Sequence, residues 1–472
     1  MAAFQPARLI SRKAHLVPGQ LHVTELFFEV PKNYAHPAAG TLKLFGRSVR
    51  KHERPIVSPS QSDLDSLDKK PYFVYLEGGP GFGNREPQES ALTRYVLNRG
   101  YQVLYLDYRG TGSSTPINAE ALRAEGGPQE QADYLKLFRA DSIVRDAEAV
   151  RLCLTANFPD EKKKWSIFGQ SFGGFVSLTY LSKYPQGLRE VFLTGGLAPV
   201  KRTAEEVYRA TFKKVVERNQ AYYRKFPEDV ANVRRAVQHI TAKGGEISLP
   251  AGGVLTAKRL LTIGSAFGGH GGFDSVHAMI LRLATDLDQF GFFTRGALNV
   301  VEQHVPFDGN PIYAILHEAI YCYKKGVASN WAAYRVGKEL QNFVWLGDEA
   351  SSFDAQGRED EPLYFSGEMV YPFHFDEYPE LSQMKEAADI LAKYDEWDDL
   401  YDEDQLRKNK VPVYAASFID DMYVDFELAR ETASMVKGIQ VYETNSMYHN
   451  AVRARTDEVV GQLFRMRDDT ID

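Results

Sequence analysis

Cysteine is almost absent from this sequence. Cys153 and Cys322 are the only two cysteines in 472 residues, so a disulfide framework is excluded. Free thiols persist where the compartment is reducing. The sequence therefore predicts a cytoplasmic protein.

Long apolar runs are missing as well. Nowhere does the chain approach the roughly 18 consecutive apolar residues that a membrane-spanning helix needs. The first residues contain no long apolar stretch and no clear cleavage site, so we expect no signal peptide. Neither a spanning helix nor a membrane partner is predicted.

A strong excess of charge of one sign is also lacking. The formal net charge is −7, and the isoelectric point is near 6.0. A mildly negative surface disfavours nucleic acid and anionic membranes as main partners. The same charge suits a small cationic ligand.

What the sequence does contain is a regular succession of short apolar segments. Helical patterns separate several of them, which is typical of a mostly parallel sheet covered on both faces. Two earlier segments, 21–31 and 41–49, alternate apolar and polar residues and predict antiparallel strands. The apolar segments lie at 71–77, 101–107, 165–169, 191–195 and 411–417.

The middle of the chain follows a different pattern and is mainly helical. We predict that residues 1–200 form the first part of an α/β core and that residues 201–405 form an inserted helical cap domain. Residues 406–472 then return to the core. The length of the chain agrees with a large domain that carries such an insertion.

The segment 165–175, WSIFGQSFGGF, begins as a strand and continues as a helix, with Ser171 at the junction. Gly169 and Gly173 flank the serine, as in the G-x-S-x-G nucleophile elbow, where a sharp turn leaves no room for neighbouring side chains. The pentapeptide alone is common. The strand before it and the helix after it make Ser171 the predicted nucleophile.

A serine nucleophile requires a base and an acid, in the chain order Ser, Asp, His for this kind of elbow. Asp420 and Asp421 follow the strand at 411–417, and His449 follows the next strand-like run at 439–443. We predict Asp421 as the acid because it lies just past the strand, on the loop. His449 is the predicted base.

The glycine-rich loop 76–84, LEGGPGFGN, follows the first buried strand. Its backbone can approach a substrate closely, so the N–H groups of Gly79 and Phe172 are the predicted oxyanion donors. Arg109, in the loop after the next strand, is predicted to brace the elbow region.

These motifs carry a resemblance to a known family. GGPGFG, LDYRGTGSS and GQSFGG, followed by a late Asp-Asp and His, resemble the proline iminopeptidases (prolyl aminopeptidases), serine peptidases of the α/β-hydrolase fold. The segments 311–321 and 365–372 resemble the long members with a large cap. The resemblance covers most of residues 70–455. It implies a serine aminopeptidase that releases N-terminal proline, or another small residue, from short peptides without a cofactor.

The resemblance also implies a set of binding residues in the cap. Glu318 and Glu368 would hold the free amino group, because a cationic amine in a closed pocket needs a paired charge. Tyr313, Tyr371 and Phe373 would line the slot for the prolyl ring.

One residue departs from the family pattern. Glu77 stands where many relatives have His or Gln. An ionised carboxylate at the oxyanion would oppose the developing charge. We therefore expect Glu77 to point away from it or to contribute to amine binding.

The sequence leaves two other functions open and disfavours two more. A carboxylesterase or amidase would share the triad without requiring a free amine, and a binding protein could retain the fold without activity. A zinc site is not predicted, because the segment HEAIY has Tyr321 where H-E-x-x-H requires a second histidine. Dehalogenases and epoxide hydrolases would need an aspartate in place of Ser171.

Overall fold

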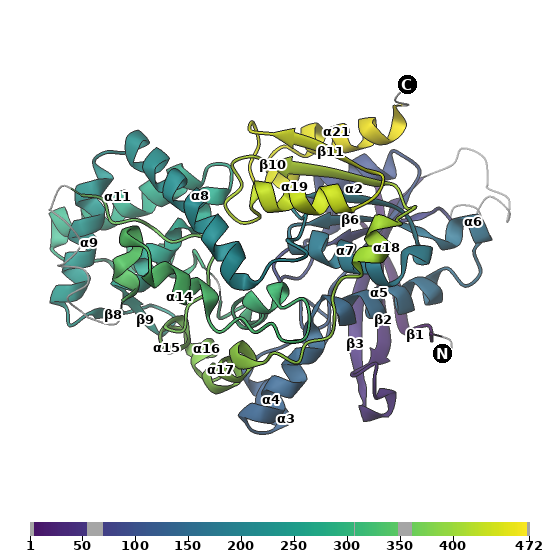
Figure 1. Cartoon of the computed structure of the whole chain (residues 1–472), viewed down its shortest axis with the longest axis horizontal. Coiled ribbons are helices and arrows are strands. Elements are labelled where there is room, and N and C mark those ends of the chain that lie inside the picture. The colour runs from purple at the N-terminus through teal and green to yellow at the C-terminus, as the bar shows by residue number, and fades with distance from the viewer. Residues whose placement is uncertain (1–3, 54–68, 306, 348–360, 470–472) are drawn as a thin grey trace.

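The protein is built around one large β-sheet (Figure 1). The computed structural model describes residues 4–53, 69–305, 307–347 and 361–469. Within these ranges the sheet has nine strands in the order β1-β2-β3-β5-β4-β6-β7-β10-β11. The strands are β1 (Arg8–Val17), β2 (Leu21–Pro31), β3 (Thr41–Lys51), β4 (Tyr72–Leu76), β5 (Gln102–Leu106), β6 (Trp165–Gln170), β7 (Leu188–Thr194), β10 (Val413–Phe418) and β11 (Ile439–Thr444).

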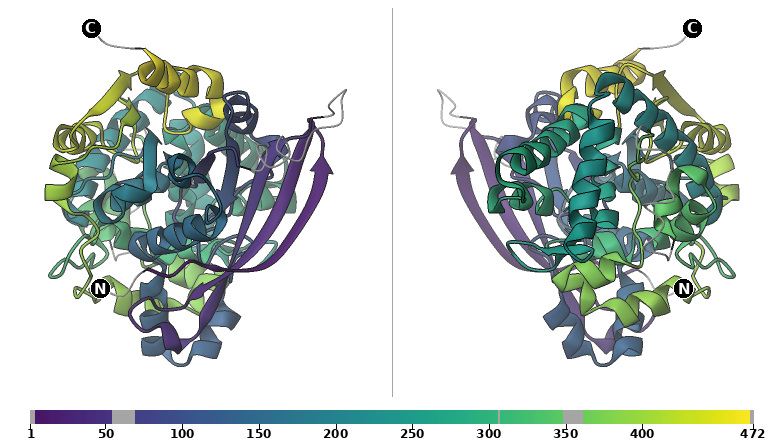
Figure 2. Two further views of the ribbon diagram at one scale, coloured as in Figure 1. Left: turned by 90° about the vertical axis from the view of Figure 1, so that its right-hand side faces the viewer. Right: turned by 90° about the vertical axis from the view of Figure 1, so that its left-hand side faces the viewer.

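The sheet is mostly parallel, as the apolar segments predicted. All neighbouring pairs from β5 to β11 are parallel, whereas β1, β2 and β3 are antiparallel and β3 joins β5 in an antiparallel pair. Every residue of β4, β5 and β6 is buried, which explains their continuous apolar sequences. Figure 2 shows the long strands β1 to β3 at the outer edge of the molecule.

The predicted antiparallel segments are confirmed as β2 and β3, but β1 was not predicted. Its side chains are almost all exposed, so its sequence has no periodic apolar face to reveal it.

Helices cover both faces of the sheet. Successive residues of β4 point to opposite faces of the sheet. Val74 packs in a hydrophobic cluster with residues of α5 and α7, whereas Phe73 packs in a second cluster with residues of α2 and α21. The helices of the core are α2 (Ala91–Leu97), α3 (Ala119–Glu125), α4 (Pro128–Leu135), α5 (Ala140–Leu154), α6 (Asp160–Lys163), α7 (Phe172–Lys183), α19 (Phe426–Met435), α20 (Ala451–Ala454) and α21 (Thr456–Asp468).

Between β7 and β10 the chain is mainly helical, and α8, α9, α11 and α14 lie to one side of the sheet (Figure 1). A short hairpin of β8 (Glu246–Ser248) and β9 (Val254–Thr256) interrupts the helices. The helices are α8 (Ala204–Lys225), α9 (Asp229–Ala242), α10 (Ala257–Leu261), α11 (Gly272–Phe290), α12 (Arg295–Glu302), α13 (Pro311–Ile315), α14 (Ala332–Lys338), α15 (His374–Glu377), α16 (Pro379–Ser382), α17 (Lys385–Lys393) and α18 (Glu403–Arg407).

The predicted domain boundaries fall at different kinds of position. The boundary at 200/201 lies in the loop after β7, whereas the boundary at 405/406 lies inside α18. The division into core and cap stays a prediction. Across the described ranges, no helix combines the length and apolar character needed to cross a membrane.

Candidate active site

Ser171 lies in the sharp turn between β6 and α7. Its backbone has φ 53° and ψ −122°, a conformation that residues with side chains rarely adopt. The turn is held from both sides, because Ser171 N–H donates to the carbonyl of Thr194 (3.1 Å) and Gly174 N–H donates to the carbonyl of Ser171 (2.7 Å). The predicted elbow geometry is therefore present.

The two flanking glycines have no space for a side chain. A Cβ on Gly173 would lie 2.0 Å from the carbonyl oxygen of Leu76, and a Cβ on Gly169 would lie 2.4 Å from that of Gly173. Both obstacles are backbone atoms, so neither can rotate away. The close packing of α7 on the sheet thus depends on the glycines of the motif.

His449 and Asp421 form a buried pair. His449 Nδ1 lies 2.7 Å from Asp421 Oδ2, while Asp421 Oδ1 accepts the N–H groups of Tyr423 (2.8 Å) and Val424 (3.1 Å). Burial alone would lower the pKa of His449, but the charge and hydrogen bond of Asp421, together with the charge of Glu368, raise it above its ordinary value.

Asp420 has a different environment from its neighbour. Its side chain is 39% exposed and lies 3.7 Å from Lys214, whereas Asp421 is only 1% exposed. The hydrogen bonds therefore favour Asp421 as the partner of His449.

The end of β7 brings the serine and histidine loops to the same edge of the sheet. A Cβ on Gly195 would lie 3.0 Å from His449 Nδ1, and a Cβ on Gly196 would lie 2.6 Å from the carbonyl oxygen of Ser171. These two adjacent glycines thus contact both loops.

The loop after β4 also reaches the serine. A Cβ on Gly78 would lie 3.1 Å from Ser171 Cβ. The N–H of Gly78 donates to Glu77 Oε1 (2.8 Å) and is thereby used within the loop. Phe172 is the first residue of α7, so its N–H has no acceptor within the helix. The assignment of Gly79 and Phe172 as oxyanion donors stays a prediction.

Glu77 is buried and paired with a cation. Its Oε1 lies 2.8 Å from Arg453 Nη2, and 3% of the residue is exposed. Contacts with Arg453 and with Gly78 favour the first predicted alternative, in which the carboxylate points away from the oxyanion. Sequence reasoning did not identify Arg453.

The two cap glutamates occupy different surroundings. Glu318 accepts the N–H groups of Ala332 (3.1 Å) and Ala333 (2.9 Å) at the start of α14, and burial raises its pKa to about 7. Glu368 accepts the hydroxyl of Tyr313 at 2.5 Å. Burial is the largest cause of the raised pKa of Tyr321, and the charges of both glutamates raise it further. Glu318 and Glu368 therefore both lie near Tyr321.

Comparison of this chain with known proteins identifies the family to which it belongs. A family model described as alpha/beta hydrolase fold matches residues 71–250. The chain is 40% identical over 461 residues to a proline iminopeptidase from Aeromonas sobria, which covers 98% of this chain and 100% of the relative. It is 39% identical over 467 residues to proline iminopeptidase aneH from Aspergillus aculeatus, and this alignment covers 99% of this chain and 98% of the relative. The chain belongs to the proline iminopeptidase family. The predicted family and α/β-hydrolase fold are confirmed.

In this member of the proline iminopeptidase family, the aromatic slot of Tyr313, Tyr371 and Phe373 stays a prediction. Tyr313 and Glu368 line a small cavity of about 30 Å³. Tyr371 and Phe373 are not among the described residues that line it. The hydroxyl of Tyr371 instead lies 2.6 Å from Ser366 Oγ, and its ring stacks on Phe373 with centroids 5.2 Å apart.

Tyr423 is a neighbour of the site that the sequence did not indicate. Its ring packs against the imidazole of His449, with centroids 4.7 Å apart, and its hydroxyl donates to the carbonyl of Ser265 in the segment after α10. The only feature of the sequence that could have pointed to Tyr423 is its position two residues after Asp421.

The prediction that Arg109 braces the elbow is wrong. Its buried guanidinium binds both carboxylate oxygens of Asp146 (2.6 and 2.7 Å) and donates to the carbonyls of Pro31, Lys32 and Leu137. Arg109 therefore ties the end of β2 to the region of α5.

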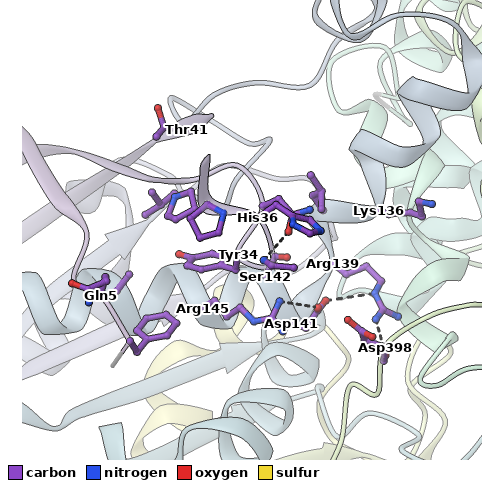
Figure 3. Close-up of a pocket in the computed structure, with 18 of the residues that line it drawn as sticks. Gln5, Tyr34, His36, Thr41, Lys136, Arg139, Asp141, Ser142, Arg145 and Asp398 are labelled. Carbon is purple, nitrogen blue, oxygen red and sulfur yellow. Dashed lines mark hydrogen bonds and ion pairs between the residues drawn. The ribbon is translucent and has the colours of Figure 1, made fainter. Parts of the chain in front are cut away.

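A much larger cavity of about 1160 Å³ lies elsewhere, between residues of the first 200 and the segment that includes Trp397 and Asp398. Figure 3 shows Asp141 there between Arg139 and Arg145, with which it forms ion pairs of 3.5 and 3.6 Å. Of the described residues that line it, none belongs to the predicted site.

Proposed function

We propose that this protein is a serine aminopeptidase that releases N-terminal proline from short peptides. The observation that carries the proposal is the buried His449–Asp421 pair, brought to the strained elbow of Ser171 by the end of β7. Support for the substrate class comes from two relatives of nearly full length that are named proline iminopeptidases.

The proposed reaction proceeds in two steps through an ester. The hydroxyl proton of Ser171 passes to His449 Nε2 while Ser171 Oγ attacks the carbonyl carbon of the first residue. The proton then passes to the peptide nitrogen, and the C–N bond breaks to release the shortened peptide. Water then attacks the ester while His449 takes its proton, and His449 returns that proton to Ser171 Oγ as the amino acid leaves.

Two features stabilise the charges that develop during this reaction. Asp421 holds the imidazole through Nδ1 and favours its cationic form. The N–H groups of Gly79 and Phe172 are proposed to donate to the oxyanion, and the positive end of α7 adds to their effect.

Glu318 and Glu368 are proposed to bind the substrate ammonium. With a pKa of about 7, Glu318 is only partly ionised near neutral pH, and a bound cation would favour its ionised form. Each oxygen of Glu318 already accepts a backbone N–H, so Glu318→Gln would also disturb the start of α14. Glu368→Gln is therefore the cleaner test of amine binding.

We also propose that the cap restricts substrates to short peptides and that the protein acts in the cytoplasm. The cysteines support a reducing compartment, since Cys153 and Cys322 are both free thiols in the structure.

The decisive experiment compares a prolyl anilide that has a free amine with its N-acetylated form. We expect turnover of the free form only, and background turnover for Ser171→Ala. Equal cleavage of both anilides would instead favour the carboxylesterase or amidase alternative. A wild-type protein that a serine-directed fluorophosphonate fails to label would favour the binding-protein alternative.

A further inference from the structure

A charged pair joins the two loops that carry the oxyanion donor and the base. Glu77 directly precedes the glycines of the oxyanion loop, and Arg453 lies on α20, four positions after His449. Arg453 Nη2 lies 2.8 Å from Glu77 Oε1. Because the two residues are 376 positions apart, this contact fixes segments from opposite ends of the chain.

The same carboxylate oxygen also organises its own loop. Glu77 Oε1 accepts the N–H of Gly78 at 2.8 Å, and the carbonyl of Glu77 accepts the hydroxyl of Tyr108 at 3.1 Å. Both the C=O and the N–H of the Glu77–Gly78 peptide unit are thereby held. The Glu77 side chain therefore holds the peptide unit that immediately precedes the one carrying the Gly79 N–H.

We propose that Glu77 and Arg453 are positioning residues that fix the oxyanion loop relative to His449. This inference rests on the proposed function and deepens it. Neither side chain touches the reacting atoms: Glu77 aligns the loop through Gly78, and Arg453 anchors Glu77 beside the base.

Other polar and charged groups lie near the pair, and the test must allow for their effect on the pKa of His449. The hydroxyl of Tyr75 lies 3.5 Å from Glu77 Oε1, and Arg85 and Glu89 line a cavity of about 130 Å³ beside the pair. Arg453 also lowers the pKa of His449, against the larger effects of Asp421. Its removal should raise that pKa, so kcat must be compared on the alkaline plateau, where His449 is neutral in every variant.

The experiment uses Arg453→Met, Glu77→Met, the double variant and the conservative variant Glu77→Gln. Arg455→Met is the matched control, because Arg455 is a nearby exposed arginine that pairs only with Glu458 among the ion pairs of the described residues. The readouts are kcat and KM for the free-amine prolyl anilide, and inhibition by prolinal and by free proline. Prolinal forms a tetrahedral adduct with the serine and therefore probes the oxyanion site, whereas proline probes ground-state binding.

We expect Arg453→Met and Glu77→Met to lower kcat by about 10- to 100-fold, less than the loss of a whole oxyanion donor, with KM nearly unchanged. Inhibition by prolinal should weaken in parallel, and inhibition by proline should not. The double variant should be no worse than Glu77→Met, because the two residues act as one unit. Glu77→Gln should recover most of the activity, since its carbonyl oxygen can still accept both hydrogen bonds. Arg455→Met should resemble the wild type.

The proposal is overturned if kcat of both methionine variants stays within about twofold of wild type, or if KM and proline inhibition change as much as kcat. A wild type that fails to cleave the anilide would overturn the proposed function and this inference together. A wild type that cleaves it, with unaffected methionine variants, would overturn this inference alone.

Discussion

Asp421→Asn tests the assignment of the acid with almost no change of shape. Both backbone N–H groups that bind Asp421 use Oδ1, at 2.8 and 3.1 Å, while His449 Nδ1 uses Oδ2 at 2.7 Å. An asparagine can place its carbonyl oxygen at the position of Oδ1 and keep both backbone bonds. Its NH₂ group then faces His449.

An amide NH₂ group only donates, so His449 Nδ1 must become the acceptor and the ring proton must move to Nε2. This tautomer cannot accept the proton of Ser171. The corresponding change in a serine protease lowers kcat by about 10⁴, or roughly 5 kcal/mol at about 1.36 kcal/mol per factor of ten. We expect kcat/KM for the prolyl anilide to fall by about 10³- to 10⁴-fold, while the thermal unfolding midpoint changes little.

Asp420→Asn is the matched control for this prediction. Asp420 lies 3.7 Å from Lys214 and its side chain is 39% exposed, so its ion pair contributes at most about 1 kcal/mol to stability. We expect wild-type kcat/KM. The reasoning fails if Asp421→Asn keeps more than about a tenth of the wild-type activity, or if Asp420→Asn loses as much as Asp421→Asn.

Three further predictions follow from the same structure. Glu368→Gln removes a charge that raises the pKa of His449, so the acidic limb of the kcat/KM profile should move to lower pH. Gly173→Ala would place a Cβ 2.0 Å from a backbone oxygen, and should lower both kcat and the free energy of unfolding, the latter by at least about 1–3 kcal/mol. Arg109→Met leaves the buried carboxylate of Asp146 unpaired and should lower the free energy of unfolding in urea by about 3–5 kcal/mol.

Each of these predictions has a control or a contrary result. An upward shift of the acidic limb in Glu368→Gln would contradict the electrostatic argument. Gly296→Ala should be neutral or slightly stabilising, because the nearest atom to its Cβ would be 3.8 Å away. Arg8→Met should lower the free energy of unfolding by no more than about 1 kcal/mol, since Arg8 is 69% exposed in its ion pair. Equal losses for Arg109→Met and Arg8→Met would refute the burial argument.

The fold was largely predictable because its strands are local patterns. Buried parallel strands appear as short apolar runs, and β4, β5 and β6 lie within a residue or so of the predicted segments. The prediction placed the start of β7 at 191, but the strand begins at Leu188. The exposed residue at position 189 interrupts the apolar run, so the sequence pattern did not show the first residues of the strand. The exposed strand β1 has no such pattern and could not be found.

The site divides in the same way between local and distant contacts. Short sequence segments were enough to predict the elbow of Ser171 and the order of Asp421 and His449. The contacts of Glu318 with the start of α14, 14 and 15 positions later, and the pairing of Glu77 with Arg453, 376 positions later, depend on how the chain folds. Nothing near either glutamate in the sequence specifies its partner. Sequence reasoning therefore named both glutamates but could not give their contacts.

The electrostatics around His449 bear on the proposed binding of a cationic N-terminus. Asp421 and Glu368 both raise the pKa of His449, while burial, Glu318 and Glu368 raise the pKa of Tyr208 and keep its hydroxyl neutral. The site thus holds several carboxylates, two of which, Asp421 and Glu368, favour protonation of the base. A base that is protonated too readily cannot accept the proton of Ser171. An ammonium group bound at Glu368, as proposed, would offset that charge and lower the pKa of His449 toward the form that reacts. Under this proposal, binding of the free N-terminus and activation of the base are coupled through Glu368.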